Sequence, residues 1–360
     1  MIGLFDIAGP LHPLRAQIDD AIARVVDSGR FILGPEVAAF EQELASWCGT
    51  RHAIGVANGT DALTIALRAM GVGPGDDVIV PSFTFYASAE AIPPTGARPV
   101  FCDVDPQTCC VTADTVRAAL TPRTKAVIAV HLFGNVAPIA DIEALGVPVI
   151  EDAAQAAGSI GADGRPGALG RAATFSFFPS KNLGCFGDGG AITTDDDAIA
   201  ELTRALRFHG SADGLRYDHV GYNSRLDELQ AAILRVALPH VDDWAGGRRA
   251  AAAHYEQAGL GELVALPVAA PGSLPAWHLY VVRSERADEL AAALAAAEIG
   301  ARAYYRTPVH RQPAMASFAA GPHLPATDEL ARAHLAIPIS PLLSAEQAAQ
   351  VVAAARSALG

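Results

Sequence analysis

The chain has 360 residues, of which 51% are hydrophobic and 18% are charged, and its net charge is −13. So apolar a composition can bury a sizeable core, which excludes global disorder. The acidic balance argues against sequence-independent binding to nucleic acids, which needs a basic surface, while a locally positive site for small anions stays compatible with it.

The five cysteines are odd in number and match no metal-binding or CxxC spacing. We therefore predict reduced thiols in a cytoplasmic protein without a bound metal. The N-terminus lacks the basic and apolar regions of a signal peptide. Charge, Gly or Pro breaks every apolar run before it reaches the length of a membrane span, so no membrane association is expected.

Hydrophobic periodicity predicts two N-terminal helices, over 13–28 and 36–47, and then an alternation of strands and helices. The predicted strands are 52–57, 78–80, 100–104, 126–130, 147–150, 173–177 and 191–194, and the predicted helices are 60–70, 86–92, 113–120, 139–145, 202–208 and 226–238. Short, continuous apolar strands between helices are typical of βα units around a mostly parallel sheet. The predicted fold class is therefore α/β, with helices on both faces of the sheet.

The pattern changes near residues 240–250. It continues with a helix over 241–258, a Pro- and Gly-rich stretch over 267–275, a strand over 277–282, and helices over 287–299 and 345–359. These elements indicate a smaller α+β unit. We predict a large α/β domain over 1–245 and a small C-terminal α+β domain over 246–360.

Ligands of open α/β sheets bind at the carboxyl ends of the strands, so the residues that follow each strand are candidate site residues. Gly59 and Thr60 follow the strand at 52–57 and begin a helix, whose free N–H groups and positive dipole end suit a phosphate. The alternative, favoured when this motif stands alone, is an ordinary cap formed by Thr60 or Asp61. No GxGxxG follows the first strand, which disfavours a dinucleotide-binding enzyme.

Two further candidates follow later strands. Asp152 comes after the strand at 147–150, where a carboxylate suits either chemistry or the capping of a helix that starts near Ala153. Lys181 follows the strand at 173–177, among aromatic and small residues. Such surroundings remove water from the amine and lower its pKa, which suits a Schiff-base nucleophile, whereas most lysines simply reach to the surface.

Taken together, these motifs resemble the DegT/DnrJ/EryC1/StrS family of sugar aminotransferases, which depend on pyridoxal phosphate. The matching segments occur in family order and cover 28–35, 58–63, 81–85, 130–134, 151–155, 176–184 and 221–230. The resemblance is dense over residues 1–245 and looser beyond them. It implies an aspartate-aminotransferase-like fold (fold type I) and a homodimer with active sites at the subunit interface.

The resemblance also implies a role for each matching residue. Lys181 would hold pyridoxal phosphate as a Schiff base and then act as general base and acid, with pyridoxamine phosphate formed during turnover. Asp152 would pair with the ring nitrogen and keep the ring an electron sink. The other implied cofactor contacts are Gln155 near the phenolic oxygen, Phe85 on the ring face, Gly59, Thr60 and Ser176 at the phosphate, and Asn223 reaching that phosphate from the neighbouring subunit.

Substrate contacts are implied at His310, Tyr222 and Arg225. Each of these assignments has a structural alternative, since a lone histidine such as His131 or His310 usually serves the fold, and Arg225 could pair with a neighbouring carboxylate. The cofactor contacts have alternatives as well: Phe85 could belong to the core, Ser176 could bond the backbone, and Asn223 could cap a helix.

The activity that the resemblance implies is transfer of an amino group from L-glutamate to a keto sugar carried by a nucleoside diphosphate, with C-3 of a dTDP-3-keto-6-deoxyhexose as the expected position. Amination of a keto-cyclitol is the alternative. A sugar dehydratase that uses pyridoxal phosphate is less expected, because such relatives carry histidine where Lys181 stands. A non-catalytic regulatory protein is less expected too, because it would lose Lys181 or Asp152.

Overall fold

The computed structural model describes residues 1–318 and 323–360. Seven strands form one sheet in the order β1-β7-β6-β5-β4-β2-β3. They are β1 (His52–Val56), β2 (Asp77–Pro81), β3 (Arg98–Cys102), β4 (Thr124–Val130), β5 (Val149–Asp152), β6 (Ala172–Ser176) and β7 (Gly190–Thr194). β7 runs antiparallel to both of its neighbours, and the other neighbouring pairs are parallel. The prediction of an α/β fold around a mostly parallel sheet is confirmed.

Helices accompany the strands of this sheet. They are α1 (Arg15–Ser28), α2 (Pro35–Cys48), α3 (Gly59–Ala69), α4 (Ala87–Glu90), α5 (Ala113–Ala119), α6 (Ile139–Glu143), α7 (Asp197–Arg207) and α8 (Glu228–Ala237). β2 and β5 are buried along their whole length, as expected for strands covered on both faces. Within the described ranges, no helix combines the length and the apolar character needed to cross a lipid bilayer.

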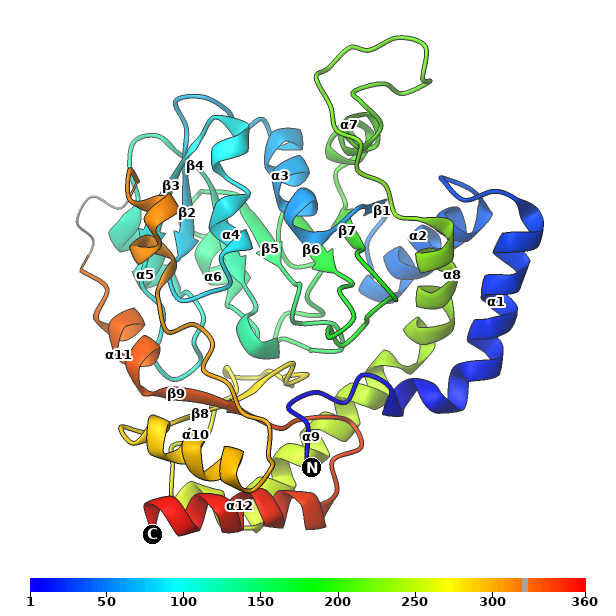
Figure 1. Cartoon of the computed structure of the whole chain (residues 1–360). Helices are drawn as coiled ribbons and strands as arrows, with labels where there is room; N and C mark the ends of the chain where they lie inside the picture. Colours follow the sequence, from blue (N-terminus) through cyan, green and yellow to red (C-terminus); the bar gives the residue numbers. More distant parts are fainter. Residues whose placement is uncertain (319–322) are drawn as a thin grey trace.

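A second, two-stranded antiparallel sheet pairs β8 (Tyr280–Arg283) with β9 (His334–Ile337). Three helices contribute to the core around it, namely α9 (Val241–Gln257), α10 (Ala287–Ala296) and α12 (Ala345–Leu359), while α11 (Pro325–Ala333) leads into β9. Figure 1 shows these elements gathered at the lower end of the molecule, where both termini also lie. The predicted boundary after residue 245 falls inside α9, so a helix and not a linker passes from one part to the other.

The first residues of the chain pack onto this second part. Ile2 forms a parallel bridge with Ile299. The N–H of Ile2 donates to the carbonyl of Glu298 at 3.1 Å, and its carbonyl accepts from the N–H of Gly300 at 2.8 Å. Ile2 also belongs to the apolar core around β8 and β9. One end of the predicted large domain is therefore attached to the smaller unit.

The structure differs from the predicted elements at three places. The helix predicted over 86–92 is only the single turn α4 and a short 3-10 turn that begins at Pro93, because proline cannot continue an α-helix. β5 extends through Asp152, and no helix starts at Ala153, so the capping interpretation of Asp152 is wrong. α11 and β9 have no counterpart among the predicted elements, since β9 is only four residues long and Pro338 follows it.

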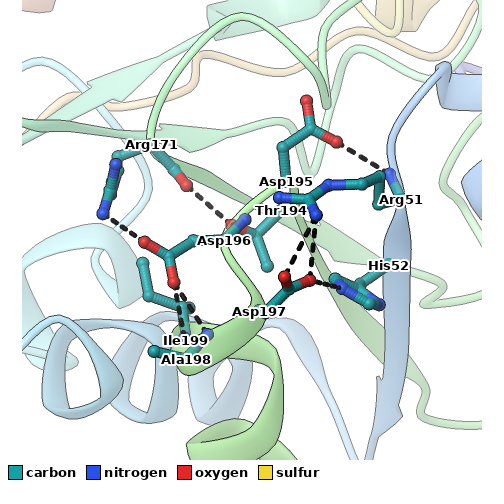
Figure 2. Close-up of polar contacts among 9 residues, drawn as sticks. All are labelled: Arg51, His52, Arg171, Thr194, Asp195, Asp196, Asp197, Ala198 and Ile199. Carbon is teal, nitrogen blue, oxygen red and sulfur yellow. Dashed lines mark hydrogen bonds and ion pairs between the residues drawn. The ribbon is translucent and has the colours of Figure 1, made fainter.

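A cluster of charged residues lies at the N-terminal ends of the parallel strands, on the opposite side of the sheet from their carboxyl ends (Figure 2). Asp196 caps α7 by accepting hydrogen bonds from two backbone N–H groups in its first turn, and it pairs with Arg171. Asp197 pairs with Arg51 at 3.1 Å and with His52 at 2.7 Å. These contacts join the starts of β1 and β6 to α7, so we assign the cluster a structural role.

Candidate active site

A cavity of about 600 Å³ lies at the carboxyl ends of the parallel strands. Its volume falls within the range of small-molecule sites, roughly 300–1,000 Å³. Seven of the predicted site residues line it: Gly59, Thr60, Phe85, Asp152, Gln155, Ser176 and Lys181. They come from four separate motif segments, so it is the folding of the sheet that brings them together.

The N-terminus of α3 forms part of the cavity wall. Asn58 caps this helix, because its Oδ1 accepts the N–H of Asp61 at 2.8 Å. The alternative in which Thr60 or Asp61 caps the helix is therefore wrong. The backbone N–H groups of Gly59 and Thr60 have no hydrogen-bond partner among the described residues, which leaves them free for an anion.

Gly59 and Ser176 approach each other closely beside this helix terminus. A Cβ atom on Gly59 would lie 2.8 Å from the Cβ and 3.4 Å from the Oγ of Ser176, so only glycine fits between the start of α3 and the end of β6. Gly190, the first residue of β7, is constrained in the same way by the carbonyl of Asn58, 2.5 Å from its ideal Cβ position. The two free N–H groups and the Ser176 hydroxyl make a donor set that fits a phosphate.

Asp152 ends β5 and is 6% exposed. Ser88 Oγ donates to its Oδ2 at 2.8 Å, and the N–H of Ala154 donates to its Oδ1 at 3.2 Å. A carboxylate at such depth needs donors or a cation around it. Because Asp152 also lines the cavity, a protonated ring nitrogen fits beside it.

Lys181 lies in the segment 177–189, which joins β6 to β7. Its Nζ has no hydrogen-bond partner in the part of the chain that the structure describes, and its side chain is partly buried. Burial lowers the pKa of Lys181 from 10.5 to about 8, against the opposing effect of the nearby Asp152 charge. The predicted lowering is confirmed, and it leaves an amine that can act as nucleophile or base near neutral pH.

Gln155 is held in one orientation. Its Oε1 accepts the N–H of Phe133 at 2.6 Å, so its Nε2 is the donor to the Tyr305 hydroxyl at 3.2 Å. Burial raises the pKa of Tyr305, which therefore stays protonated and keeps its own O–H for another acceptor. Tyr304 and Tyr305 both line the cavity, so they are the members of the segment preceding His310 that reach it.

Phe85 is 55% exposed although it lines the cavity, so the alternative that places it in the core is wrong. Its aromatic neighbour is Tyr305, at 6.1 Å between ring centroids. An apolar ring left this exposed is stabilised when a flat ligand covers it.

Four predicted site residues lie outside this cavity, namely Tyr222, Asn223, Arg225 and His310. His310 Nδ1 lies 2.5 Å from Ser82 Oγ. The Tyr222 hydroxyl accepts a hydrogen bond of 3.2 Å from Arg68. Asn223 is exposed and does not cap α8, which Asp227 precedes. Arg225 forms no ion pair with any described carboxylate.

The loop that contains three of these four residues extends from the body of the molecule after α7 (Figure 1). Leu215, Tyr217 and Val220 are 86%, 61% and 82% exposed on it. Large apolar side chains gathered on one protruding segment are typical of contact with another chain.

Two histidines near the sheet edge have different surroundings. His131 is buried, and because its Nδ1 accepts the N–H of Ala137, its Nε2 carries the proton and donates to Glu151 at 2.9 Å. Glu151 also accepts three backbone N–H groups from residues 167–170, so this pair serves the fold. His278 instead lines the cavity with Lys181, and nothing in the local sequence distinguishes it from a core residue.

Comparisons with known proteins agree with this geometry. Residues 13–356 match the model of the DegT/DnrJ/EryC1/StrS aminotransferase family. A dTDP-3-amino-3,4,6-trideoxy-alpha-D-glucose transaminase from Streptomyces venezuelae is 48% identical over 364 residues, covering 99% of this chain and 95% of the relative. S. venezuelae DesV, whose crystal structure was determined in complex with a ketimine intermediate, is 46% identical in sequence. The two structures superpose with a TM-score of 0.95, covering 99% of this chain and 98% of DesV. NtdA from Bacillus subtilis with bound cofactor PMP is 27% identical, with a TM-score of 0.88 and coverage of 100% and 86%.

Proposed function

The chain belongs to the DegT/DnrJ/EryC1/StrS aminotransferase family, and from this membership we propose that it transfers an amino group from L-glutamate to a keto sugar carried by a nucleoside diphosphate. It is a transaminase that depends on pyridoxal phosphate. We propose C-3 of a dTDP-3-keto-6-deoxyhexose as the position that receives the amino group. The observation that carries this proposal is 48% identity, over almost the whole chain, to a transaminase whose name places the amino group at position 3 of a dTDP-linked sugar.

Pyridoxal phosphate supplies, when bound, an electron-poor ring that stabilises negative charge on the carbon that loses a proton. The N–H groups of Gly59 and Thr60 and the hydroxyl of Ser176 would bind its phosphate. Asp152 would hold a proton at the ring nitrogen, and Phe85 would cover one face of the ring. These roles are consistent with the free N–H groups, the buried carboxylate and the exposed ring found in the cavity.

Lys181 would hold the cofactor covalently through Nζ and, when released, move a proton at that same atom. A positioned acid–base group of this kind contributes about 10²- to 10⁴-fold to a rate. Gln155 uses one of its two Nε2 protons for Tyr305, so the second is available for the phenolic oxygen of the cofactor.

We propose a homodimer in which each active site is completed by the other subunit. The ionised side chains that line the cavity of one chain are Asp61, Glu90, Asp152, Asp188 and Lys181, so carboxylates outnumber cations. A nucleoside diphosphate brings two more negative charges, which favours additional cations from outside. Arg225 of the partner subunit could supply one of them, and Asn223 of the partner subunit could reach the phosphate, because both residues lie outside their own cavity and within the exposed loop after α7.

We also propose a cytoplasmic location. All five cysteines are unpaired, which is consistent with a reducing compartment.

The substrate is tested with purified protein, pyridoxal phosphate and L-glutamate, assayed against dTDP-, UDP- and GDP-linked keto sugars and against keto-cyclitols. We expect amino sugar and 2-oxoglutarate to form fastest with the dTDP-3-keto-6-deoxyhexose, and Lys181→Ala protein serves as the blank. Preferential turnover of a 4-keto isomer would move the aminated position to C-4. Turnover of a keto-cyclitol without turnover of any nucleotide sugar would overturn the proposed substrate class.

The shared active site is tested by mixing two variants that we expect to be inactive on their own. Lys181→Ala and Asn223→Ala each remove one necessary group from every site of a homodimer. After exchange of subunits, a mixed dimer contains one site with both Lys181 and Asn223 intact. We expect the mixture to regain up to about a quarter of the wild-type rate, whereas sites built from single chains would regain nothing.

A further inference from the structure

The neighbours of His278 fix which of its ring nitrogens carries the proton. Asn182 Nδ2 donates to the carbonyls of Ala157 and Ala276, at 3.2 Å and 3.1 Å, so the Oδ1 of Asn182 must be an acceptor. This oxygen lies 3.3 Å from His278 Nδ1. Nδ1 therefore carries the proton and donates a hydrogen bond to Asn182 Oδ1. Nε2 of the neutral ring is left as a hydrogen-bond acceptor.

The free acceptor of His278 lies at the same cavity as Lys181. His278 is 4% exposed, it lines the cavity, and its Nε2 has no partner among the described residues. Its ring packs against Phe5, at 6.0 Å between centroids. Because Asn182 directly follows Lys181 in the chain, the hydrogen bond at Nδ1 also fixes the imidazole relative to the backbone of the lysine.

Burial, together with nearby positive charges, keeps His278 neutral. Burial lowers the pKa of His278 well below 6.5, and the positive charges of Lys181 and Arg248 lower it further. Burial lowers the pKa of Arg248 to about 10, and the negative charge of Asp6 opposes this shift. The other charged or titratable groups of the cavity are Asp61, Glu90, Asp152, Asp188, Tyr304 and Tyr305. A neutral imidazole beside an ammonium group can only accept a hydrogen bond from it.

We propose that His278 is a positioning residue for Lys181, whose Nζ donates a hydrogen bond to His278 Nε2 through one water molecule of the cavity. The imidazole thereby stabilises the ammonium form of the lysine and orients its Nζ. This proposal goes beyond the sugar substrate, since it concerns the protonation of Lys181. It rests on the proposed role of that lysine only for its effect on catalysis.

The composition of the chain makes the protonation of Lys181 measurable, because Lys125 and Lys181 are the two lysines of the sequence and Lys125 is exposed. The full-length protein is freed of cofactor with hydroxylamine. Its lysines are then acetylated with acetic anhydride between about pH 6 and 10, and the rate at each lysine is followed by mass spectrometry, with Lys125 as internal reference. We expect a midpoint for Lys181 near pH 8 in the wild-type chain.

His278→Phe keeps a flat ring against Phe5 but offers no acceptor. We expect it to lower the Lys181 midpoint by about 0.5–1 pH unit, the scale of one lost hydrogen bond. His278→Gln carries an acceptor oxygen and should restore at least half of that shift. His334→Phe is the matched control, since His334 is equally buried, bonds the carbonyl of Leu330 and does not line the cavity.

Two results would overturn the proposal, namely an unchanged Lys181 midpoint in His278→Phe, and an equal shift in the His334→Phe control. A measurement on the wild-type chain keeps the test decisive if a variant fails to fold. Nitrogen-15 NMR of its histidines should find His278 as the Nδ1–H tautomer, and an Nε2–H tautomer would refute the assignment. Both measurements are independent of which sugar the enzyme uses, so they separate this proposal from the proposed substrate.

Discussion

Glu228 and Gly34 are 194 positions apart in the sequence, yet a carboxylate oxygen of Glu228 accepts a hydrogen bond of 2.8 Å from the backbone N–H of Gly34. The same carboxylate accepts the N–H groups of Glu36 and Val37, at 2.9 Å and 2.8 Å. Glu228 is 1% exposed, so it satisfies the first turn of α2 from within the core. Two of the motif segments, 28–35 and 221–230, are joined in this way.

Glu228→Gln should therefore destabilise the fold. An amide has only one acceptor oxygen, so its NH₂ group would face a backbone N–H and leave both unsatisfied. We expect a loss of about 1.5–3 kcal/mol in the free energy of unfolding, measured by urea titration. Glu43→Gln, which changes a partly exposed partner of Arg235, is the control and should stay within about 0.5 kcal/mol of wild type. Equal stability of the two variants would contradict the role given to Glu228.

Gly59→Ala should weaken cofactor binding more than it affects folding. The added Cβ would meet Ser176 at 2.8 Å and displace one wall of the predicted phosphate site. We expect the dissociation constant of pyridoxal phosphate, measured by absorbance titration, to rise at least about tenfold, which corresponds to one or two lost hydrogen bonds. The control is Gly73→Ala, where the new Cβ would meet nothing within 4 Å. Unchanged affinity in Gly59→Ala would place the phosphate elsewhere.

Lys181→Ala should abolish transamination, with a fall in kcat of at least about 10²- to 10⁴-fold. Borohydride treatment of the wild-type holoenzyme should leave the cofactor attached to the peptide that contains Lys181. Lys125→Ala is the matched control and should retain wild-type kcat, because Lys125 is exposed on β4. Cofactor recovered on the Lys125 peptide, or turnover by Lys181→Ala, would rule out the proposed mechanism.

Lys181 should make the cofactor-free chain less stable at low pH. Below about pH 8 the lysine is charged in both states, so the folded state carries the full cost of burying the charge. Between about 8 and 10.5 the folded chain has released the proton while the unfolded chain still holds it, so stability rises with pH. Lys181→Met should therefore be more stable than wild type near pH 7, with an advantage that shrinks from about pH 8 to pH 10. Urea titrations across this range check it, and a pH-independent difference would contradict it.

Much of the fold follows from local sequence pattern. The apolar runs of β2 and β4 and the periodicity of α1 and α2 are explicit in the chain, and their predicted positions agree with the structure to within a few residues. The end of β5 was not predictable in this way, because Glu151 and Asp152 are charged residues that resemble the start of a loop. Glu151 stays in the strand because His131 and three distant backbone N–H groups satisfy its carboxylate. These hydrogen bonds to the buried carboxylate form only in the folded chain, so the local sequence does not reveal them.

The residues of the candidate site likewise fall into those that the sequence could predict and those that it could not. Residues that directly follow a strand, such as Gly59 and Lys181, could be found because the topology of a parallel sheet places them at one edge. His278 and Tyr305 could not, since each reaches the cavity through a tertiary contact, with Asn182 and with Gln155 respectively. For His310 the sequence motif implied a substrate contact. In the structure its imidazole lies against Ser82, outside the cavity.

The bridge between Ile2 and Ile299 has a consequence for synthesis of the protein in the cell. Ribosomes add about 5–20 residues each second, so Ile299 is synthesised some tens of seconds after Ile2. The sheet that carries the cavity can form during that interval. Closure of the smaller unit onto Ile2 must therefore follow translation of Ile299, so the segment around Ile2 stays without this anchor while the sheet forms.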